Sequence, residues 1–264
     1  MALFKPAWQS DDWMKEEKAL KEVEKENSQN QLAVIAKIAP LDEVRLAAVT
    51  KLTDQSALTH VAKTEKNIKV YSKAIDKITS QSALVDIAKN SKDSYVRSHA
   101  VSKINDQAAL IHIAKNDADS SIRSQVVREI SDQSVLAHIA KNDADDYVRQ
   151  LAVEMITSNT ALIYAAKNDK FTGVRYAAID KIDDQDLLAD IVNTATYFEE
   201  TLTSGFDLNN GTILNPTKGK EDLSYSIQAH ALNRMTDKTL LANIAKNHKD
   251  EFIRDKATVR ISGL

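Results

Sequence analysis

A segment of 26 residues in the middle of the chain occurs twice in succession. Residues 105–130 read NDQAALIHIAKNDADSSIRSQVVREI, and residues 131–156 read SDQSVLAHIAKNDADDYVRQLAVEMI. Self-similarity at a fixed period of about 20 to 50 residues is typical of proteins built from stacked repeats. The sequence therefore predicts an array of similar units.

Each unit carries two short amphipathic patterns joined by turn-forming residues. Apolar residues recur at helix spacing in both halves of residues 105–130: Leu110, Ile113 and Ala114, then Ile122, Val126, Val127 and Ile130. Between the halves, residues 116–119 favour a turn. Asp119 is placed to cap the second helix, as Asn105 and Asp106 are for the first. The unit is predicted as helix–turn–helix, and it needs neighbours because neither helix can bury its apolar stripe alone.

The 26-residue frame fits the whole chain, with units beginning at residues 27, 53, 79, 105, 131, 157, 183 and 236. One leucine of the first helix recurs in every unit: Leu32, Leu58, Leu84, Leu110, Leu136, Leu162, Leu188 and Leu241. Residues 27–182 hold six regular units, residues 183–235 hold one unit with an inserted loop at about 195–224, and residues 236–264 hold the last. We interpret residues 1–264 as a single domain.

Residues 1–26 fill one further period, but only their second half carries the helical pattern, on a helix expected from near Asp12. We interpret this segment as an N-terminal capping half-repeat. Terminal units of a stacked array must cover the open end of the core. The apolar residues available for this are Leu3, Phe4, Trp8 and Trp13. An aromatic partner-binding tail is the competing interpretation.

The composition agrees with a helical array. Of the 264 residues, 43% are hydrophobic and 28% charged, with five glycines and three prolines, which favours an all-α protein with a continuous core. There is no cysteine, which removes disulfides and thiolate chemistry and is compatible with the cytoplasm, the location that we predict. No stretch is typical of a signal peptide or a membrane span. The net charge of −3 gives no basic footprint for nucleic acid.

The run D-x-x-V-R-x-x-A-V-x-K-I at residues 93–104 resembles the second helix of HEAT repeats, especially the short form named after phycobilisome lyases. The resemblance covers nearly the whole chain, and we predict a right-handed α-solenoid of eight such units. In that family an aspartate of the turn and an arginine of the second helix form a ladder between neighbouring units. The matching residues here are Asp93, Asp119, Asp145 and Asp250, with Arg45, Arg97, Arg123, Arg149, Arg175 and Arg254; Tyr71 and Gln228 interrupt the ladder. Because a catalytic residue needs to occur only once, we interpret this recurring set as structural.

The inserted loop is the largest departure from the repeat, because the unit that contains it spans 53 residues in a 26-residue frame. Insertions in such arrays often belong to the binding surface. The candidate binding residues of the loop are Phe206, Asp207, Asn210 and Lys218. A calcium loop is disfavoured, since Lys218 stands where a bidentate glutamate is needed. A tolerated insertion without function is equally compatible with the sequence.

The exposed face of the second helices is the other candidate site, because in HEAT-like arrays it generally lines the concave surface. Tyrosines and a leucine exposed in register suggest a partner groove, since aromatic side chains supply contact area at modest entropic cost. Scattered surface aromatics are also ordinary. The candidate partner-binding residues are Tyr95, His99, Gln125, Arg128, Tyr147, Leu151 and Tyr176.

Three histidines share one position in their units, namely His60, His112 and His138, and Asp86 and Asp190 occupy the same column. Two of the histidines could approach one ion. No third ligand lies at close spacing and the motif HExxH is absent, so we expect no metal site and no cofactor.

These observations favour a non-enzymatic scaffold that binds a protein or peptide. The competing hypothesis is an enzyme, either a HEAT-like DNA glycosylase or another nucleic-acid-binding enzyme, which needs a basic channel for phosphates. The predicted concave columns carry a net charge of −1, from Lys69, Lys73, Arg128 and Lys256 against Glu43, Asp76, Glu154, Asp180 and Asp255. Nucleic acid is therefore an unfavoured partner. A chromophore-lyase-like activity, which the family name suggests, lacks a singular acid, base or nucleophile.

Overall fold

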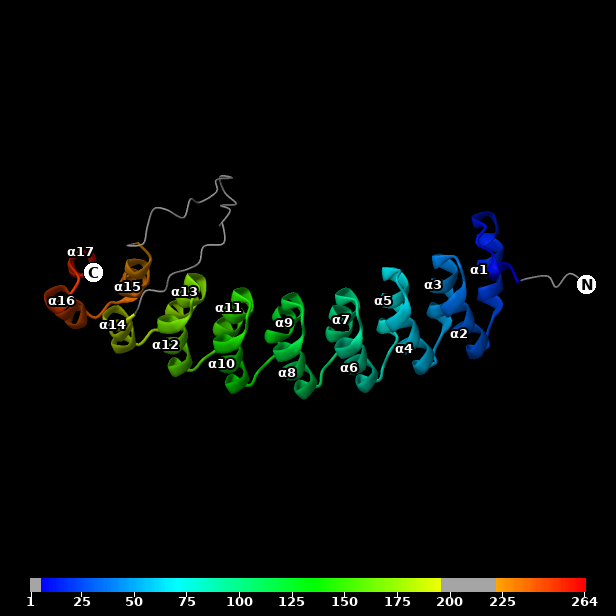
Figure 1. Ribbon diagram of the computed structural model, residues 1–264, viewed down its shortest axis with the longest axis horizontal. Coiled ribbons are helices and arrows are strands. Elements are labelled where there is room, and N and C mark those ends of the chain that lie inside the picture. The colour runs from blue at the N-terminus through cyan, green and yellow to red at the C-terminus, as the bar shows by residue number, and fades with distance from the viewer. Residues whose placement is uncertain (1–5, 196–221) are drawn as a thin grey trace, which may run out of the picture. The chain divides into compact units, whose positions relative to one another are not determined.

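The computed structural model describes residues 6–195 and 222–264 of the chain, and within these residues every regular element is a helix (Figure 1). The contacts within the chain divide it into two compact parts, residues 1–129 and 130–264, called here the N-terminal and C-terminal parts. The prediction of an all-α protein is confirmed.

The N-terminal part contains two short 3-10 helices followed by nine α-helices: η1 (Ala7–Gln9), η2 (Trp13–Lys15), α1 (Glu16–Lys25), α2 (Gln29–Ile38), α3 (Asp42–Lys51), α4 (Gln55–Thr64), α5 (Ile68–Asp76), α6 (Gln81–Asn90), α7 (Ser94–Val101), α8 (Gln107–Asn116) and α9 (Ser120–Val127). The described residues of the C-terminal part contain α10 (Gln133–Asn142), α11 (Asp146–Met155), α12 (Asn159–Asn168), α13 (Thr172–Asp180), α14 (Gln185–Thr194), α15 (Asp222–Arg234), α16 (Lys238–Asn247) and α17 (Glu251–Ser262).

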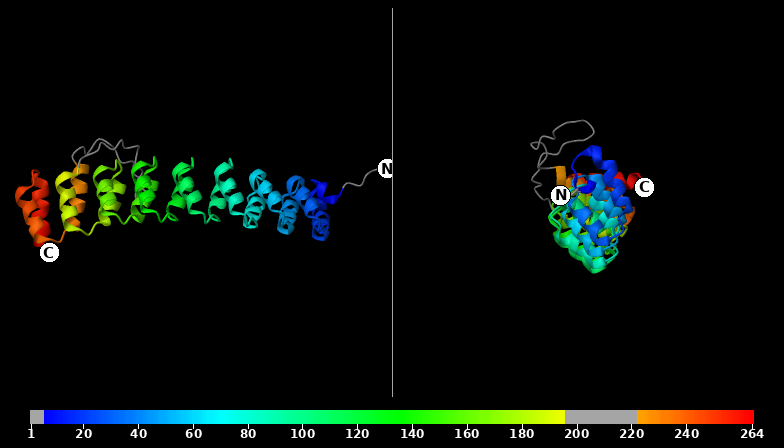
Figure 2. Two further views of the ribbon diagram at one scale, coloured as in Figure 1. Left: turned by 90° about the horizontal axis from the view of Figure 1, so that it is seen from below. Right: turned by 90° about the vertical axis from the view of Figure 1, so that its right-hand side faces the viewer.

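The helices pack as consecutive pairs. From α2 onward each even-numbered helix is the first helix of a unit and packs against the odd-numbered helix that follows it, as α2 does on α3 and α10 on α11. Within each part, neighbouring second helices also pack on one another, such as α3 on α5 and α11 on α13 (Figures 1 and 2). Every unit therefore has two edges, one formed by first helices and one by second helices.

Local chemistry explains where the helices begin. Asp106 accepts hydrogen bonds from the backbone amides of Ala108 and Ala109, and Asp119 accepts one from the amide of Ser121, so these two predicted caps are confirmed. Asn105 lies before the cap, and its amide donates to Gln81 of the preceding unit. Aspartate or serine caps most of the other first helices in the same way. The helix starts are thus specified by side chains that satisfy amides which no helical carbonyl can reach.

The repeated leucine forms the centre of the core in both parts. All eight predicted leucines are buried, with exposed fractions of 3% or less: Leu32, Leu58, Leu84, Leu110, Leu136, Leu162, Leu188 and Leu241. Alanines such as Ala48, Ala74 and Ala178 are fully buried on the second helices, where their small side chains allow close helix packing. The predicted core register is confirmed.

A column of glutamines, which the sequence reasoning did not single out, ties successive units together. The Nε2 group of Gln55 donates to the carbonyl oxygen of Lys77 at 3.2 Å, and its Oε1 atom accepts from the backbone amide of Thr79 at 2.9 Å. Gln29, Gln81 and Gln133 make the same pair of bonds, to the end of their own second helix and to the start of the next unit. The signal in the sequence was the 26-residue spacing of these glutamines.

Basic side chains near the ends of second helices supply a second link between units. The Nζ groups of Lys51, Lys77 and Lys181 donate to carbonyl oxygens at the end of the preceding second helix, those of Glu24, Thr50 and Glu154. A cation at this position also complements the negative end of the helix dipole. These contacts satisfy carbonyls that would otherwise have no intrahelical partner.

The N-terminal segment only partly matches its predicted role. Trp8 is buried, with 6% of its surface exposed, and η1 packs against α1, whose Ala19 and Val23 are fully buried. Trp13 is 75% exposed, so the prediction that it covers the core is wrong. The Asp12 side chain caps the turn that contains Trp13, and this residue then occupies an outward position on the first turn of η2. Leu3 and Phe4 lie outside the described residues.

Candidate functional site

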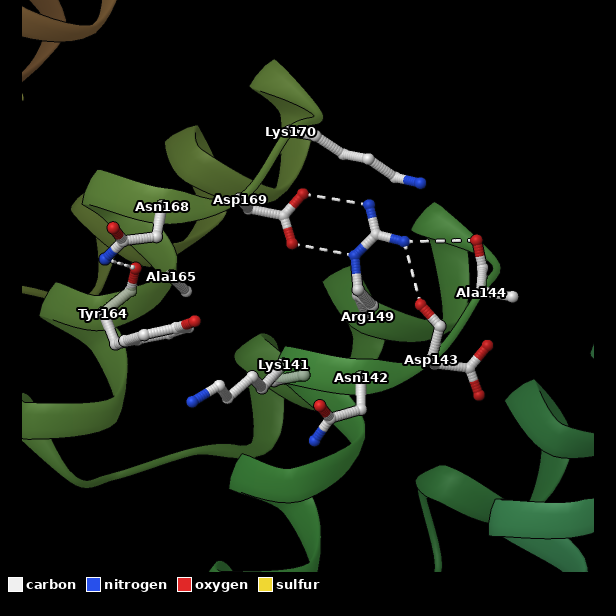
Figure 3. Close-up of a pocket in the computed structure, with 11 residues that line it drawn as sticks. Lys141, Asn142, Asp143, Ala144, Arg149, Tyr164, Ala165, Asn168, Asp169 and Lys170 are labelled. Atoms are coloured by element: carbon white, nitrogen blue, oxygen red, sulfur yellow. Dashed lines mark hydrogen bonds and ion pairs between the residues drawn. The ribbon is translucent and has the colours of Figure 1, made fainter. Parts of the chain in front are cut away.

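One hollow of the C-terminal part lies beside the turns that join the first helix of a unit to the second, where one unit meets the next (Figure 3). We call this side of the units the turn edge. It has a volume of about 320 Å³. The guanidinium of Arg149 stands at its centre and donates to both carboxylate oxygens of Asp169 at 2.8 and 2.9 Å. Its remaining nitrogen, Nη1, donates to the carbonyl oxygens of Asp143 and Ala144 at 3.0 and 3.3 Å. Since each nitrogen of the fork already has a protein partner, Arg149 is not available to a ligand.

The same arrangement recurs in the N-terminal part. Arg45 donates to Glu65 at 2.6 Å and to the carbonyl oxygens of Ala39 and Pro40, beside a hollow of about 270 Å³. Arg97 donates to both carboxylate oxygens of Asp117 at 3.0 Å. Recurrence shows that these hollows belong to the joint between units and not to a site with a unique function.

The electrostatics of this joint favour the charged state of both partners. The hydrogen bond that Arg149 donates to Asp169 raises the pKa of Arg149 against the opposing effect of burial. Burial by itself raises the pKa of Glu65, but hydrogen bonds from Arg45 and from the amides of Asn67 and Lys66 outweigh it and leave the pKa below its ordinary value. The joints are therefore bidentate ion pairs that are intact at neutral pH.

The predicted ladder exists with a different set of carboxylates. Asp93 accepts from the amides of Tyr95 and Val96, and Asp119, Asp145 and Asp250 likewise cap their second helices. For Arg97 and Arg149 the ion-pair partners are not these aspartates, and Arg45, whose unit lacks such an aspartate, also pairs with Asp42 of its own helix. Their partners are Glu65, Asp117 and Asp169, each 20 residues further along the chain, in the turn of the next unit.

A 20-residue spacing is the signal that could have revealed these pairs. Where tyrosine replaces arginine, at Tyr71, the position 20 residues later is Ser91; where glutamine replaces it, at Gln228, that position is His248. Both interruptions thus lack the arginine and the carboxylate together. This pattern agrees with pairing between units and not within them.

A second kind of region, the second-helix face of the C-terminal part, carries a cluster in which a ring stacks on a histidine–aspartate pair. The Nε2 atom of His230 on α15 lies 2.7 Å from Oδ1 of Asp180 on α13. The ring of Tyr176, also on α13, stacks on the imidazole with 4.4 Å between centroids and 24° between planes. Tyr176 and Asp180 are four residues apart and so share one face of their helix. About a third of the His230 side chain and half of the Asp180 side chain are exposed, at 31% and 53%.

Neighbouring second helices extend this face with further rings. Tyr147 on α11 is 52% exposed and Phe252 on α17 is 44% exposed. The ammonium group of Lys256 lies 5.3 Å from the centre of the Phe252 ring, within the range of a cation–π contact. With Tyr176 and His230, each of the four consecutive second helices α11, α13, α15 and α17 presents a ring among its described side chains. We call the set Tyr147, Tyr176, His230 and Phe252 the ring row.

The N-terminal part holds a related pair at the same positions of its units. His99 on α7 lies 3.2 Å from Asp76 on α5, and Lys103 also pairs with this carboxylate at 2.9 Å. The hydrogen bond from Lys103, assisted by that from His99, lowers the pKa of Asp76 although burial opposes it. In the N-terminal part a lysine joins the histidine–aspartate pair by binding the aspartate. In the C-terminal part the ring of Tyr176 joins the pair by stacking on the histidine.

The predicted residues of this face have different outcomes. Tyr95 is 73% exposed, and Arg128 is also exposed. Gln125 is half-buried and bridges α9 to α7, because it accepts from the Ser98 hydroxyl at 2.7 Å and donates to the Ser98 carbonyl at 3.2 Å. Leu151 is buried, with only 3% of its surface exposed, so its expected exposure is wrong. Leu151 and Ala177 occupy the same position in successive units, and Ala177 is half-buried. This position lies where neighbouring second helices pack on each other, so an apolar side chain there is covered.

The remaining predicted residues are those of the inserted loop. Phe206, Asp207, Asn210 and Lys218 lie outside the described residues. In the part of the chain that the structure describes, no group of three or more histidines and acidic residues could hold a metal ion. Asp86 and Asp190 of the histidine column pair with Lys63 and Lys167 of the preceding units.

Two further findings bear on the class of protein. No described helix combines the length and the apolar character needed to cross a membrane. Compared with models of known families, with curated proteins and with solved structures, the chain matches none of them. The second-helix face, with its exposed rings, is therefore the region that indicates a function.

Proposed function

We propose that the protein is a non-enzymatic scaffold that binds a protein or peptide along the second-helix face of its C-terminal part. The observation that carries this proposal is the ring row, with one solvent-accessible ring on each of four consecutive second helices. Aromatic side chains are enriched where binding energy concentrates, because they bring a large contact area with few rotatable bonds.

The spacing of the ring row suits an extended chain. Packed helices lie about 8 to 10 Å apart, and an extended peptide advances about 3.3 Å per residue. A bound peptide would thus place about every third residue against a new second helix. Tyr176 is held in place by its stack on His230, which is fixed in turn by Asp180, so less side-chain entropy is lost on binding.

The charges of the face support a peptide in preference to a phosphate backbone. Asp180 and Glu154 lie on the second helices α13 and α11 and are exposed to solvent. Carboxylates among the rings repel phosphate groups, which a nucleic-acid-binding enzyme would need to attract. No observation on this face favours catalysis on nucleic acid over binding of a peptide.

We further propose that the chain is a right-handed α-solenoid of eight short HEAT-like repeats after an N-terminal cap, with the second-helix face as its concave side. The consecutive packing of helix pairs and the recurring links between units support this assignment. A cytoplasmic location is proposed because the chain has no cysteine. An experimental structure with left-handed stacking would overturn the first statement, and cell fractionation tests the second.

The function is tested by quantitative affinity capture from the source cell with three immobilised forms. These are the unmodified chain, the double variant Tyr147→Ala, Tyr176→Ala, and the control Tyr164→Ala. Tyr164 is 42% exposed but lies on a first helix, α12, and its ring faces Lys141. We expect a protein that is retained by the unmodified chain and by the control and lost from the double variant.

Direct binding must follow with the purified partner, measured by calorimetry. A further form, in which a short linker replaces residues 196–221, tests whether the inserted loop contributes to the affinity. If the double variant retains the same proteins as the unmodified chain, the ring row is not the binding site. If nucleic acid is captured instead and a purified oligonucleotide binds the unmodified chain, the scaffold proposal is wrong.

A further inference from the structure

A groove lies between α1 and α3 at the second-helix edge of the N-terminal part, where the capping helix meets the first complete unit. The two helices that form it are neighbours in Figure 1. Its volume is about 730 Å³. The floor is apolar and includes Leu20 of α1 with Leu46 and Ala47 of α3, all of which are half-buried. We call this the capping groove. It is separate from the ring row, which belongs to the C-terminal part.

The apolar floor is not a consequence of the repeat. One unit further along the chain, the positions of Leu46 and Ala47 are taken by Ser72 and Lys73, which are polar. The helical turn η2, which contains Trp13, leads directly into α1, so Trp13 stands at the entry to the helix that carries Leu20. Trp13 is 75% exposed, which adds a large apolar surface at the start of α1.

The rim of the capping groove is acidic. Glu16, Glu24 and Glu43 line it. Within the described residues Glu16 and Glu24 have no ion-pair partner, and Glu43 makes a 3.7 Å contact with Lys69 in which both side chains are more than half exposed. Exposed pairs of this kind neutralise little of a local field.

Two lysines also line the groove, against four glutamates, so its lining carries a net negative charge. Lys21 pairs with Glu17 at 2.6 Å. Lys51 donates to the carbonyl oxygens of Val23 and Glu24, where it caps the end of α1. The surface that faces a partner is therefore an apolar floor with a rim that is acidic on balance.

We propose that the capping groove binds an amphipathic helix of a partner protein, with leucine-like residues on one face and lysine or arginine on its flanks. A helix that lays its apolar face into a hydrophobic groove is a recurring mode of peptide recognition. Basic flanks place positive charge against Glu16, Glu24 and Glu43, which favours this orientation and speeds association. The proposal is independent of the function assigned to the C-terminal part.

The probe for this proposal is a synthetic peptide of leucine and lysine, about four helical turns long, with leucines at helix spacing. The protein has two tryptophans, of which Trp8 is buried and Trp13 exposed, and the peptide has none. Binding should therefore shift the emission of Trp13 to shorter wavelengths, and calorimetry gives the affinity. A peptide with the same leucines but glutamate in place of lysine is the charge control.

Three variants decide the outcome. Leu46→Gln should weaken binding by about tenfold or more, which corresponds to about 1.4 kcal/mol. The double variant Glu16→Gln, Glu24→Gln should weaken peptide binding less than Leu46→Gln does, and it should reduce the dependence of binding on salt. It changes only charges that solvent can reach, so we expect it to fold. Ile38→Gln, an equally conservative change at a 63% exposed residue of α2, should leave binding unchanged.

Three results would overturn the proposal. The first is equal affinity of the lysine peptide for the unmodified chain and Leu46→Gln, with both folded by circular dichroism. The second is equal affinity of the unmodified chain for the lysine and glutamate peptides. The third is self-association of the unmodified chain in sedimentation experiments that Leu46→Gln abolishes, since a second copy would then occupy the groove.

Discussion

Along the turn edge, an arginine forks onto a carboxylate and two backbone carbonyls in the joints of Arg45, Arg97 and Arg149. On the second-helix face of the same units, one column of the repeat changes at every step: Glu43, Lys69, Tyr95, Ser121, Tyr147, Gly173 and, in the last unit, Phe252. The edge keeps its residues because each contact holds one unit against the next. The face can vary because its side chains project into solvent and leave the packing unchanged, which makes it the region where recognition can be placed.

The largest expected effect is at a joint. Arg149→Ala leaves the buried carboxylate of Asp169 without its partner, and breaking a buried ion pair in this way costs about 3 to 5 kcal/mol. Arg149 and Asp169 are only 3% and 6% exposed in their side chains. Urea unfolding measures the loss, with Tyr147→Ala on the exposed face as the control that should change stability by less than about 0.5 kcal/mol. If Arg149→Ala and Tyr147→Ala lowered the free energy of unfolding equally, the turn edge and the second-helix face would not differ in their contribution to stability.

A similar but somewhat smaller effect is expected in the core. Leu136→Ala removes a side chain that is fully buried and leaves a cavity, which costs about 2 to 5 kcal/mol. The free energy of urea unfolding is the measurement. An unchanged value would show that the helices are packed in another register.

The glutamine links should contribute less, since each replaces a bond to water. Gln55→Ala removes the bonds to the Lys77 carbonyl and the Thr79 amide and should cost about 1 to 3 kcal/mol, at about 0.5 to 1.5 kcal/mol for each hydrogen bond. Gln55→Glu keeps the acceptor for the Thr79 amide but loses the donor to the Lys77 carbonyl. Its stability should therefore lie between those of the unmodified chain and Gln55→Ala. A loss no greater for Gln55→Ala than for Gln55→Glu would contradict a two-sided link.

The smallest expected effect is the pH dependence of stability that Glu65 contributes at its joint with Arg45. The folded pKa of Glu65 lies below its ordinary value of 4.5, so its contribution is fully present above pH 4.5 and is lost as the pH falls through the folded pKa. Below pH 4.5 the unmodified chain should therefore lose stability more steeply than Glu65→Gln, as measured by urea unfolding at a series of pH values. Parallel curves for the two proteins would show that the Arg45–Glu65 joint adds no pH dependence.

The second-helix face illustrates how far the sequence could lead to the candidate site. Tyr147 and Tyr176 could be placed on it because helix spacing separates outward positions from the buried columns. The stack of Tyr176 on His230 could not, because 54 residues separate them and only the packing of α13 on α15 brings the rings together. Leu151 was misplaced for the same reason, since the neighbouring second helix covers a position that one isolated helix would expose.

The sequence by itself determined the helices, their starts and the buried leucine column, because capping and amphipathic spacing act within about ten residues and are copied every 26. Tertiary structure decided which carboxylate each arginine takes. Asp93 is nearer to Arg97 in sequence, but it is occupied as a helix cap, and the stacking of units delivers Asp117 instead. Contacts inside a unit follow from local spacing, whereas contacts between units depend on the geometry with which one helix pair packs on the next.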